Sequence, residues 1–148
     1  MTSPLTAIFA RIDTRLAAIE GVQSYQRMPS GDPDRFPAIE AYDNGDEPVP
    51  DPEVGVTRLG LMLTVAGYVE TGGAIAHDAL IALHAAAVQV LCGDEGSDLG
   101  LPGMVELIEI VGRRRVDIAE LAKKRRLGFE QDFLIQYSTV RGDPSQPA

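Results

Sequence analysis

The sequence predicts an α+β fold, a mixed or antiparallel sheet of about five strands with two helices packed on one face and with long projecting strands. Residues 54–70 alternate with a period of two, as a long half-buried strand does. Residues 4–20 and 74–91 instead repeat apolar residues at helical spacing. Short strand-like segments lie around them, so one sheet with helices on one face is the expected arrangement of layers.

The first predicted helix begins with Ser3 as a candidate N-cap and Pro4 at the first helical position, and Gly21 ends it. Its apolar side chains share one face and are Leu5, Ile8, Phe9, Ile12, Leu16 and Ile19. Residues 22–27 and 37–43 then read as short strands, with a Pro- and Gly-containing loop between them.

The stretch from Val54 to Glu70 is the longest predicted strand. A straight strand of this length spans roughly 55 Å. A compact domain of this chain length is only about 38 Å across. We therefore expect the strand to bend at Gly60 or Gly67, or to project at one end. A projecting strand exposes unpaired backbone groups, which favours contact with another chain.

An acidic, proline-rich segment precedes the long strand. Residues 43–53 carry three prolines and no basic residue, so we expect an extended, solvated loop. One interpretation is a simple connection. The other is an interface or channel surface, whose candidate residues are Asp46, Glu47, Asp51 and Glu53.

The second predicted helix, residues 74–91, is apolar nearly all round, and Gly93 ends it. Alanines on its outer face would permit close approach of another subunit. His77 and His84 lack a carboxylate or cysteine at ligand spacing, so no metal site is predicted, and their role is left open. Cys92 is expected to be a buried small apolar residue.

A loop at 93–103 lacks a phosphate-binding pattern, and residues 104–111 read as a strand. Seven of the thirteen basic residues follow in one short span. They are Arg113, Arg114, Arg115, Lys123, Lys124, Arg125 and Arg126. This span is either a solvated loop, a weak nucleic-acid site, or a surface that pairs with the acidic segment of a neighbouring copy. Such head-to-tail pairing generates closed rings, so both charged segments are candidate subunit interfaces.

The last predicted strand covers residues 127–140, and 142–148 is expected to be a flexible tail. Residues 1–141 are predicted to form a single domain. A chain of 148 residues needs no disulfide or metal to fold, and its one cysteine allows no internal disulfide.

The charge and motifs restrict the function classes. A net charge of −9 argues against general affinity for nucleic acid or an anionic membrane. No signal peptide or spanning segment is recognised, so a soluble protein made in a reducing cytosol is expected. No catalytic signature, cofactor pattern or metal-ligand motif is found, so we predict no enzyme activity and no cofactor.

Three segments resemble the tail terminator family of long-tailed phages and tail-derived particles, the minor tail protein U type. They are Glu20-Gly21-Val22 at the end of the first helix, Phe36-Pro37-Ala38-Ile39 at the entry to a strand, and Leu134-Ile135-Gln136-Tyr137-Ser138-Thr139 before Asp143-Pro144. The order of elements over most of the chain is also similar to that family.

The resemblance implies a structural virion protein at the neck end of the tail, assembled in the bacterial host cytoplasm. It implies a ring of six copies, with the tail tube on one face, the head-tail connector on the other, and DNA passing through the pore without specific binding or membrane contact. Two alternatives remain open. One is a head-side connector or stopper protein of the same particle or of a gene transfer agent. The other is a small-molecule-binding or enzymatic host protein.

Overall fold

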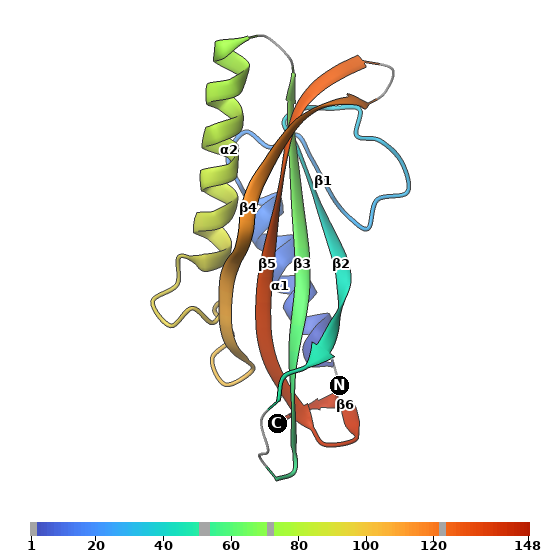
Figure 1. The fold of residues 1–148 in the computed structure, drawn as a ribbon, viewed down its shortest axis with the longest axis vertical. Coiled ribbons are helices and arrows are strands. Elements are labelled where there is room, and N and C mark those ends of the chain that lie inside the picture. The colour runs from blue at the N-terminus through green and yellow to red at the C-terminus, as the bar shows by residue number, and fades with distance from the viewer. Residues whose placement is uncertain (1–2, 51–53, 71–72, 122–123) are drawn as a thin grey trace.

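The computed structural model describes residues 3–50, 54–70, 73–121 and 124–148 and is elongated along its strands (Figure 1). Within these residues it has two helices and a six-stranded mixed sheet, which confirms the predicted α+β class. The elements are α1 (Pro4–Ala17), β1 (Ser24–Arg27), β2 (Ala38–Pro48), β3 (Val56–Glu70), α2 (Ala74–Cys92), β4 (Val105–Leu121), β5 (Lys124–Val140) and β6 (Asp143–Pro147).

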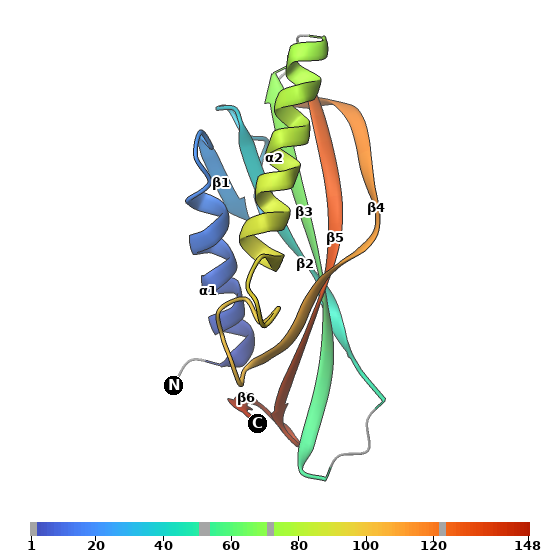
Figure 2. The ribbon, with the colours of Figure 1, turned by 90° about the vertical axis from the view of Figure 1, so that its left-hand side faces the viewer.

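The sheet is open, with the strand order β1-β2-β3-β5-β4 and β6 added beside β5. β1 runs parallel to β2, and all other neighbouring strands are antiparallel. Both helices cover the same face of the sheet (Figure 2). α1 lies toward the β1 edge, and α2 lies over the central strands.

Helix α1 begins as predicted, because Ser3 accepts a hydrogen bond from the Thr6 amide and Pro4 occupies the first turn. Its apolar face is buried against the sheet together with the inner face of α2. The sheet contributes the alternate residues of β3 and β5 that face the helices, including Leu61, Leu63, Phe129 and Phe133.

Strand β3 neither bends nor breaks at its glycines. Its register with β5 is continuous from Val56 to Glu70, so Gly60 and Gly67 do not serve as hinges. The strand is longer than the diameter expected for a round domain, and the elongated shape of the domain accommodates it. The domain is long rather than round, and β3 extends past α1 at one end of the long axis (Figure 1).

The acidic segment is more regular than predicted. β2 continues to Pro48, so residues 43–48 pair with β3 instead of forming a loop. A register shift lies between Asp43 and Asp46, where Gly45 has φ +87°. A bulge with a glycine at positive φ lets the strand carry an extra residue and continue pairing.

The basic span is also not a loop. β4 runs without interruption through Arg113–Arg115 to Leu121, and β5 begins at Lys124. The two strands form a hairpin in which Val116 and Ile118 oppose Phe129 and Leu127. Apolar alternation across this pair explains why charged residues are held in a strand.

The expected loose tail contains β6, which pairs with the end of β5 through Thr139↔Pro147 and Val140↔Asp143. Its prolines do not prevent pairing, because a strand beside only one neighbour tolerates missing donors.

Candidate subunit interfaces

The sheet face without helices, which we call the open face, is defined by the register. Arg58, Thr64 and Tyr68 of β3 lie opposite Ser138, Asp132 and Gly128 of β5, and these side chains point away from the core. Carboxylates outnumber guanidinium groups along the central part of this face. The carboxylates are Glu40, Glu106, Glu109, Asp117, Glu130 and Asp132, and the guanidinium groups are Arg58 and Arg115.

One polar cluster on the open face is centred on Glu106. Arg58 Nε donates to its carboxylate at 2.9 Å, and the Ser138 hydroxyl donates to the same group. Burial alone would raise the pKa of Glu106, but these hydrogen bonds outweigh it and lower the pKa below its usual range. The cluster ties β3, β4 and β5 together with Glu106 ionised.

A second cluster is centred on Asp132. Arg115 pairs with Asp132 at 3.2 Å and with Glu130 at 3.0 Å. Thr64 donates to Asp132 at 2.6 Å, and Asn44 donates to Thr64 at 2.5 Å. Burial opposes ionisation of Asp132, but the hydrogen bonds from Arg115 and Thr64 lower its pKa. Four strands are therefore linked across the open face.

Glu40 is the buried carboxylate of the open face, only 4% exposed. Burial raises its pKa, while a hydrogen bond from the Tyr42 hydroxyl at 2.9 Å acts in the opposite direction. Burial and Glu40 also raise the pKa of Tyr68 to about 12. Both tyrosines are thus neutral donors near neutral pH.

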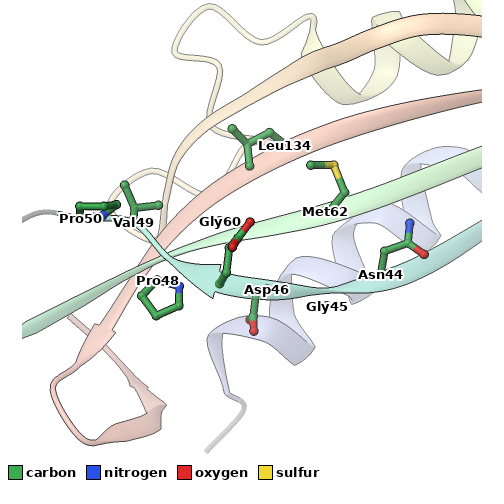
Figure 3. A pocket seen from close by; sticks show the side chains of 10 residues that line it. Asn44, Gly45, Asp46, Pro48, Val49, Pro50, Gly60, Met62 and Leu134 are labelled. Carbon is green, nitrogen blue, oxygen red and sulfur yellow. The ribbon is translucent and has the colours of Figure 1, made fainter.

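A shallow hollow of about 640 Å³ lies on the open face near the end of β2. Met62, Leu134 and Val49 supply its apolar surface beside Gly60 (Figure 3). Asp46 extends to the other side of β2, away from Met62 and Leu134 (Figure 3). Asn44 and Glu47 also line the hollow, so it is a depression of mixed polarity in a charged face.

The predicted acidic candidates lie in different settings. The bulge in β2 turns Asp46 toward the helix-covered face, where its carboxylate accepts a hydrogen bond from Tyr137. Glu47 is exposed and lies opposite Gly60 on the open face. Asp51 and Glu53 lie outside the described residues.

The predicted basic candidates are likewise divided. Arg115 is engaged by Glu130 and Asp132 within the chain. Arg126 is buried, and its guanidinium lies 4.3 Å from the centre of the Phe36 ring. Arg115 thus has partners within the chain although its side chain remains 43% exposed, whereas Arg126 is buried.

The other basic candidates lie on the surface of the β4–β5 hairpin. The side chains of Arg113 and Arg114 make no hydrogen bond or ion pair with the described residues, and Lys124 and Arg125 are exposed at the start of β5. Lys123 lies outside the described residues. The end of β2 and the start of β5 lie at opposite ends of the long axis (Figure 1).

The two histidines are separated in role. His84 Nε2 lies 3.0 Å from Gln131 Oε1, and its ring meets Phe129 edge-on at 5.1 Å. His77 is exposed on α2.

Burial raises the pKa of the Cys92 thiol to about 11. Within the described ranges, no three His, Cys, Asp or Glu side chains are grouped so that they could hold a metal ion.

Sequence reasoning missed the buried amide of Gln131. Its Nε2 donates to the carbonyls of Val111 and Gly112 at 3.3 Å, where the register of β4 shifts. The sequence pattern could have predicted this role, because Gln131 is a polar residue at a position of the apolar face, between Phe129 and Phe133. A polar residue at such a position usually satisfies a backbone irregularity.

The fold of the chain is similar to that of a chain in a solved structure titled "Virion of native gene transfer agent (GTA) particle". The TM-score is 0.52 at 15% sequence identity, and the match covers 88% of this chain and 91% of that chain. No family model matches the sequence. No curated protein matches it either.

Proposed function

We propose that this chain is a structural protein of a tailed virion or gene transfer agent particle. The observation that carries the proposal is the fold similarity over 88% of the chain to a protein of a gene transfer agent virion. The segments that resemble tail terminators agree with it, because they lie just after α1, at the start of β2, and within β5.

Within such a particle, the proposed role is that of the tail terminator. A ring of copies, six by the resemblance, sits on the head-proximal end of the tail tube and stops its growth. One ring face makes contacts with the tube, and the other face receives the head-tail connector. The protein has no catalytic role in this proposal.

The open face suits a surface that DNA passes. Along its central part the carboxylates exceed the guanidinium groups, and the two arginines there, Arg58 and Arg115, are paired with carboxylates. Phosphates bind proteins mainly through unpaired lysines and arginines, with release of counterions. A wall with paired arginines and excess carboxylates therefore repels the backbone of DNA and lets it slide.

Exposed charges suit the ends of the ring. Glu47 is exposed near the end of β2, and Lys124 is exposed at the start of β5, and these strand ends lie toward opposite ends of the long axis (Figure 1). In a ring whose subunits stand with their long axes along the tail, these charges face the layers above and below. In this proposal the charges act between stacked layers, in place of the pairing between neighbouring copies that the sequence predicted.

Mixing experiments test the proposed role. The purified protein is added to polymerising tail-tube subunits of the same particle, and tube length and end structure are measured by electron microscopy. A terminator stops growth and leaves a ring at one end of each tube. Tubes that continue to grow at the same rate with no added ring would contradict the role.

The head-side connector or stopper is the second candidate. The similar structure is a whole virion, so its title is equally compatible with a protein on the head side. A stopper would leave tube growth unchanged and would instead bind DNA-filled heads. The same mixing experiment, repeated with purified heads, separates the two roles.

A further inference from the structure

Four of the eight large apolar residues that are exposed among the described residues gather between α2 and β4. We call them the apolar strip: Ile81 on α2, and Ile110, Val116 and Ile118 on β4. Each is between 42% and 49% exposed. Half-buried apolar side chains gathered in one place mark a surface that is covered in the functional state.

The register places the strip on the helix-covered face. Ile110 and Val116 lie directly opposite Phe133 and Phe129, which are buried in the core beneath the helices. Residues directly opposite each other in an antiparallel pair share a face. These side chains are exposed because α2 lies over β3 and β5 and does not extend across β4 (Figure 2).

Ile81 extends the strip onto the helix. His84, one turn along α2 on the same side, contacts Phe129 and Gln131 of β5. That side of α2 therefore faces the edge of the sheet that ends in β4. The only acidic residue of α2 is Asp78, one turn before Ile81, so the helix places a single charge at the border of the strip.

Strand β4 is also an open edge of the sheet. The Ser97 carbonyl accepts from the Ile108 amide, so the preceding loop covers the beginning of this edge. Beyond Ile108, no described strand pairs with the outer side of β4. A long free edge beside an apolar strip is a template for another strand.

The opposite edge of the same sheet offers a matching surface. There β1 is the outer strand, and Met28 at its end is 55% exposed. Asp13 of α1 and Arg27 of β1 pair with each other at 3.6 Å, so these two charges offset each other at this edge. The outer side of α1 is small and uncharged, with Thr6, Ala10, Thr14 and Ala17 exposed.

We propose that the apolar strip binds the β1–α1 edge of a second copy of this chain. A second copy whose β1 lies beside β4 extends the sheet, and its α1 then lies on the same face as α2, over the strip. Each copy uses two different surfaces, so the contact is head-to-tail and can close into a ring. This inference rests on the proposed function, because it specifies the lateral contact of the ring.

A membrane is the competing occupant. α2 is long and apolar enough to cross a bilayer by length and composition, and 28% of its most apolar window is buried. Three of the four strip residues, however, belong to a β-strand that also carries Arg113, Arg114 and Glu120. A second copy buries the strip while these charges remain in water.

The oligomeric state in solution tests the proposal directly. Light scattering on the full chain is compared for the unchanged protein, for Ile118→Glu, and for Val54→Glu as the matched control. Val54 is 90% exposed and lies two residues before β3, whose beginning is at the end of the long axis away from the start of β5 (Figure 1). We expect Ile118→Glu to raise the concentration needed for assembly at least about tenfold, because a carboxylate would have to be buried in the contact. Val54→Glu should leave assembly unchanged.

Cross-linking tests the identity of the occupant. In a Cys92→Ala background, Met28→Cys and Ile118→Cys proteins are oxidised separately and as a mixture. The head-to-tail contact predicts linked dimers only in the mixture. Linkage of Ile118→Cys protein to itself would indicate a symmetric contact and overturn the proposal, and so would absence of linkage in the mixture.

The outcomes separate this inference from the proposed function. If Ile118→Glu assembles as the unchanged protein does and still stops tube growth, the strip is not the contact although the function stands. If the unchanged protein stays monomeric and floats with phosphatidylcholine vesicles while Ile118→Glu does not, the strip binds lipid and the proposal fails. Assembly that depends on Ile118 in a protein without effect on tube growth supports the contact and refutes the terminator role.

Discussion

Gly67 and Phe129 show how single residues determine the packing of the two central strands. A Cβ on Gly67 would lie 2.1 Å from the Phe129 ring, which is buried beneath the helices. On the other face, a Cβ on Gly128 would lie 2.7 Å from the Tyr68 ring. Each aromatic ring therefore covers the glycine opposite it, and this requirement, rather than bending, explains these two glycines.

Gly67→Ala should lower the free energy of unfolding by about 1–3 kcal/mol, because the Phe129 ring has no free space into which it can move. Gly60→Ala on the same strand is the control. There the nearest atom is the Leu134 Cδ1 at 3.2 Å, the end of a flexible side chain. Denaturant unfolding of both variants measures the difference, and equal losses of stability would refute the explanation.

Glu40 predicts a pH dependence of stability. Burial is the main cause that raises the pKa of Glu40 in the folded protein above its pKa in the unfolded chain. The protonated carboxyl therefore contributes to stability below the unfolded-state pKa, and this contribution is lost as the pH rises through the folded-state pKa. Glu40→Gln should therefore melt at a higher temperature than the unchanged protein at pH 7.5, and the gain should disappear near pH 4.

Thermal melts across this range measure the effect of Glu40, with the exposed Glu47→Gln as the control. The stability of the Glu40→Gln variant is compared with that of the unchanged protein at each pH. If the variant is the less stable of the two at pH 7.5 but not at pH 4, the ionised carboxylate stabilises the fold and the explanation is wrong. Glu106 and Asp132 contribute in the opposite sense, since their lowered pKa values make the fold lose stability as the pH falls.

At the scale of elements, the β4–β5 hairpin is where sequence reasoning and the structure differ most. Arginines and lysines at 113–115 and 123–126 favoured a loop, because charged runs are usually solvated. The strand persists because its partner residues are apolar on one face and acidic on the other, where Arg115 meets Glu130 and Asp132. These pairings join residues about fifteen apart, and no local pattern reports them.

Gln131 holds the irregular part of this hairpin. Gln131→Leu would leave the Val111 and Gly112 carbonyls without their side-chain donor, which should cost about 1–3 kcal/mol. Hydrogen exchange of the amides in residues 111–121 should accelerate more than exchange in β3. Gln136→Leu, on the open face, is the matched control. Unchanged exchange in 111–121 would mean that Gln131 does not support the bulge.

For the whole molecule, apolar and charged contacts are expected to act in different directions. The apolar strip lies at a lateral edge of the sheet, whereas the exposed Glu47 and Lys124 belong to strand ends that lie toward the two ends of the long axis (Figure 1). Screening shortens the range of charge interactions to about 3 Å at 1 M salt but leaves apolar contacts intact or stronger. Ring formation and stacking on the tube should therefore respond differently to salt.

Raising sodium chloride from about 50 mM to about 500 mM should weaken capping of tail tubes while the oligomer measured by light scattering persists. Arg113→Glu combined with Lys124→Glu should reproduce the loss of capping at low salt. Arg115→Glu is not suitable for this purpose, because it also breaks ion pairs within the chain. Salt-induced dissociation of the oligomer itself would show that the lateral contact is electrostatic.

The sequence by itself determined the fold class, both helices and the central strands, because cap residues and apolar periodicity are local properties. It also determined that acidic and basic residues are segregated along the chain. Only the tertiary structure decided which of these charges remain available, since Asp46, Arg115 and Arg126 find partners from other strands or loops. It also decided that α2 leaves β4 half covered, because the extent of a helix over a sheet depends on packing between distant segments.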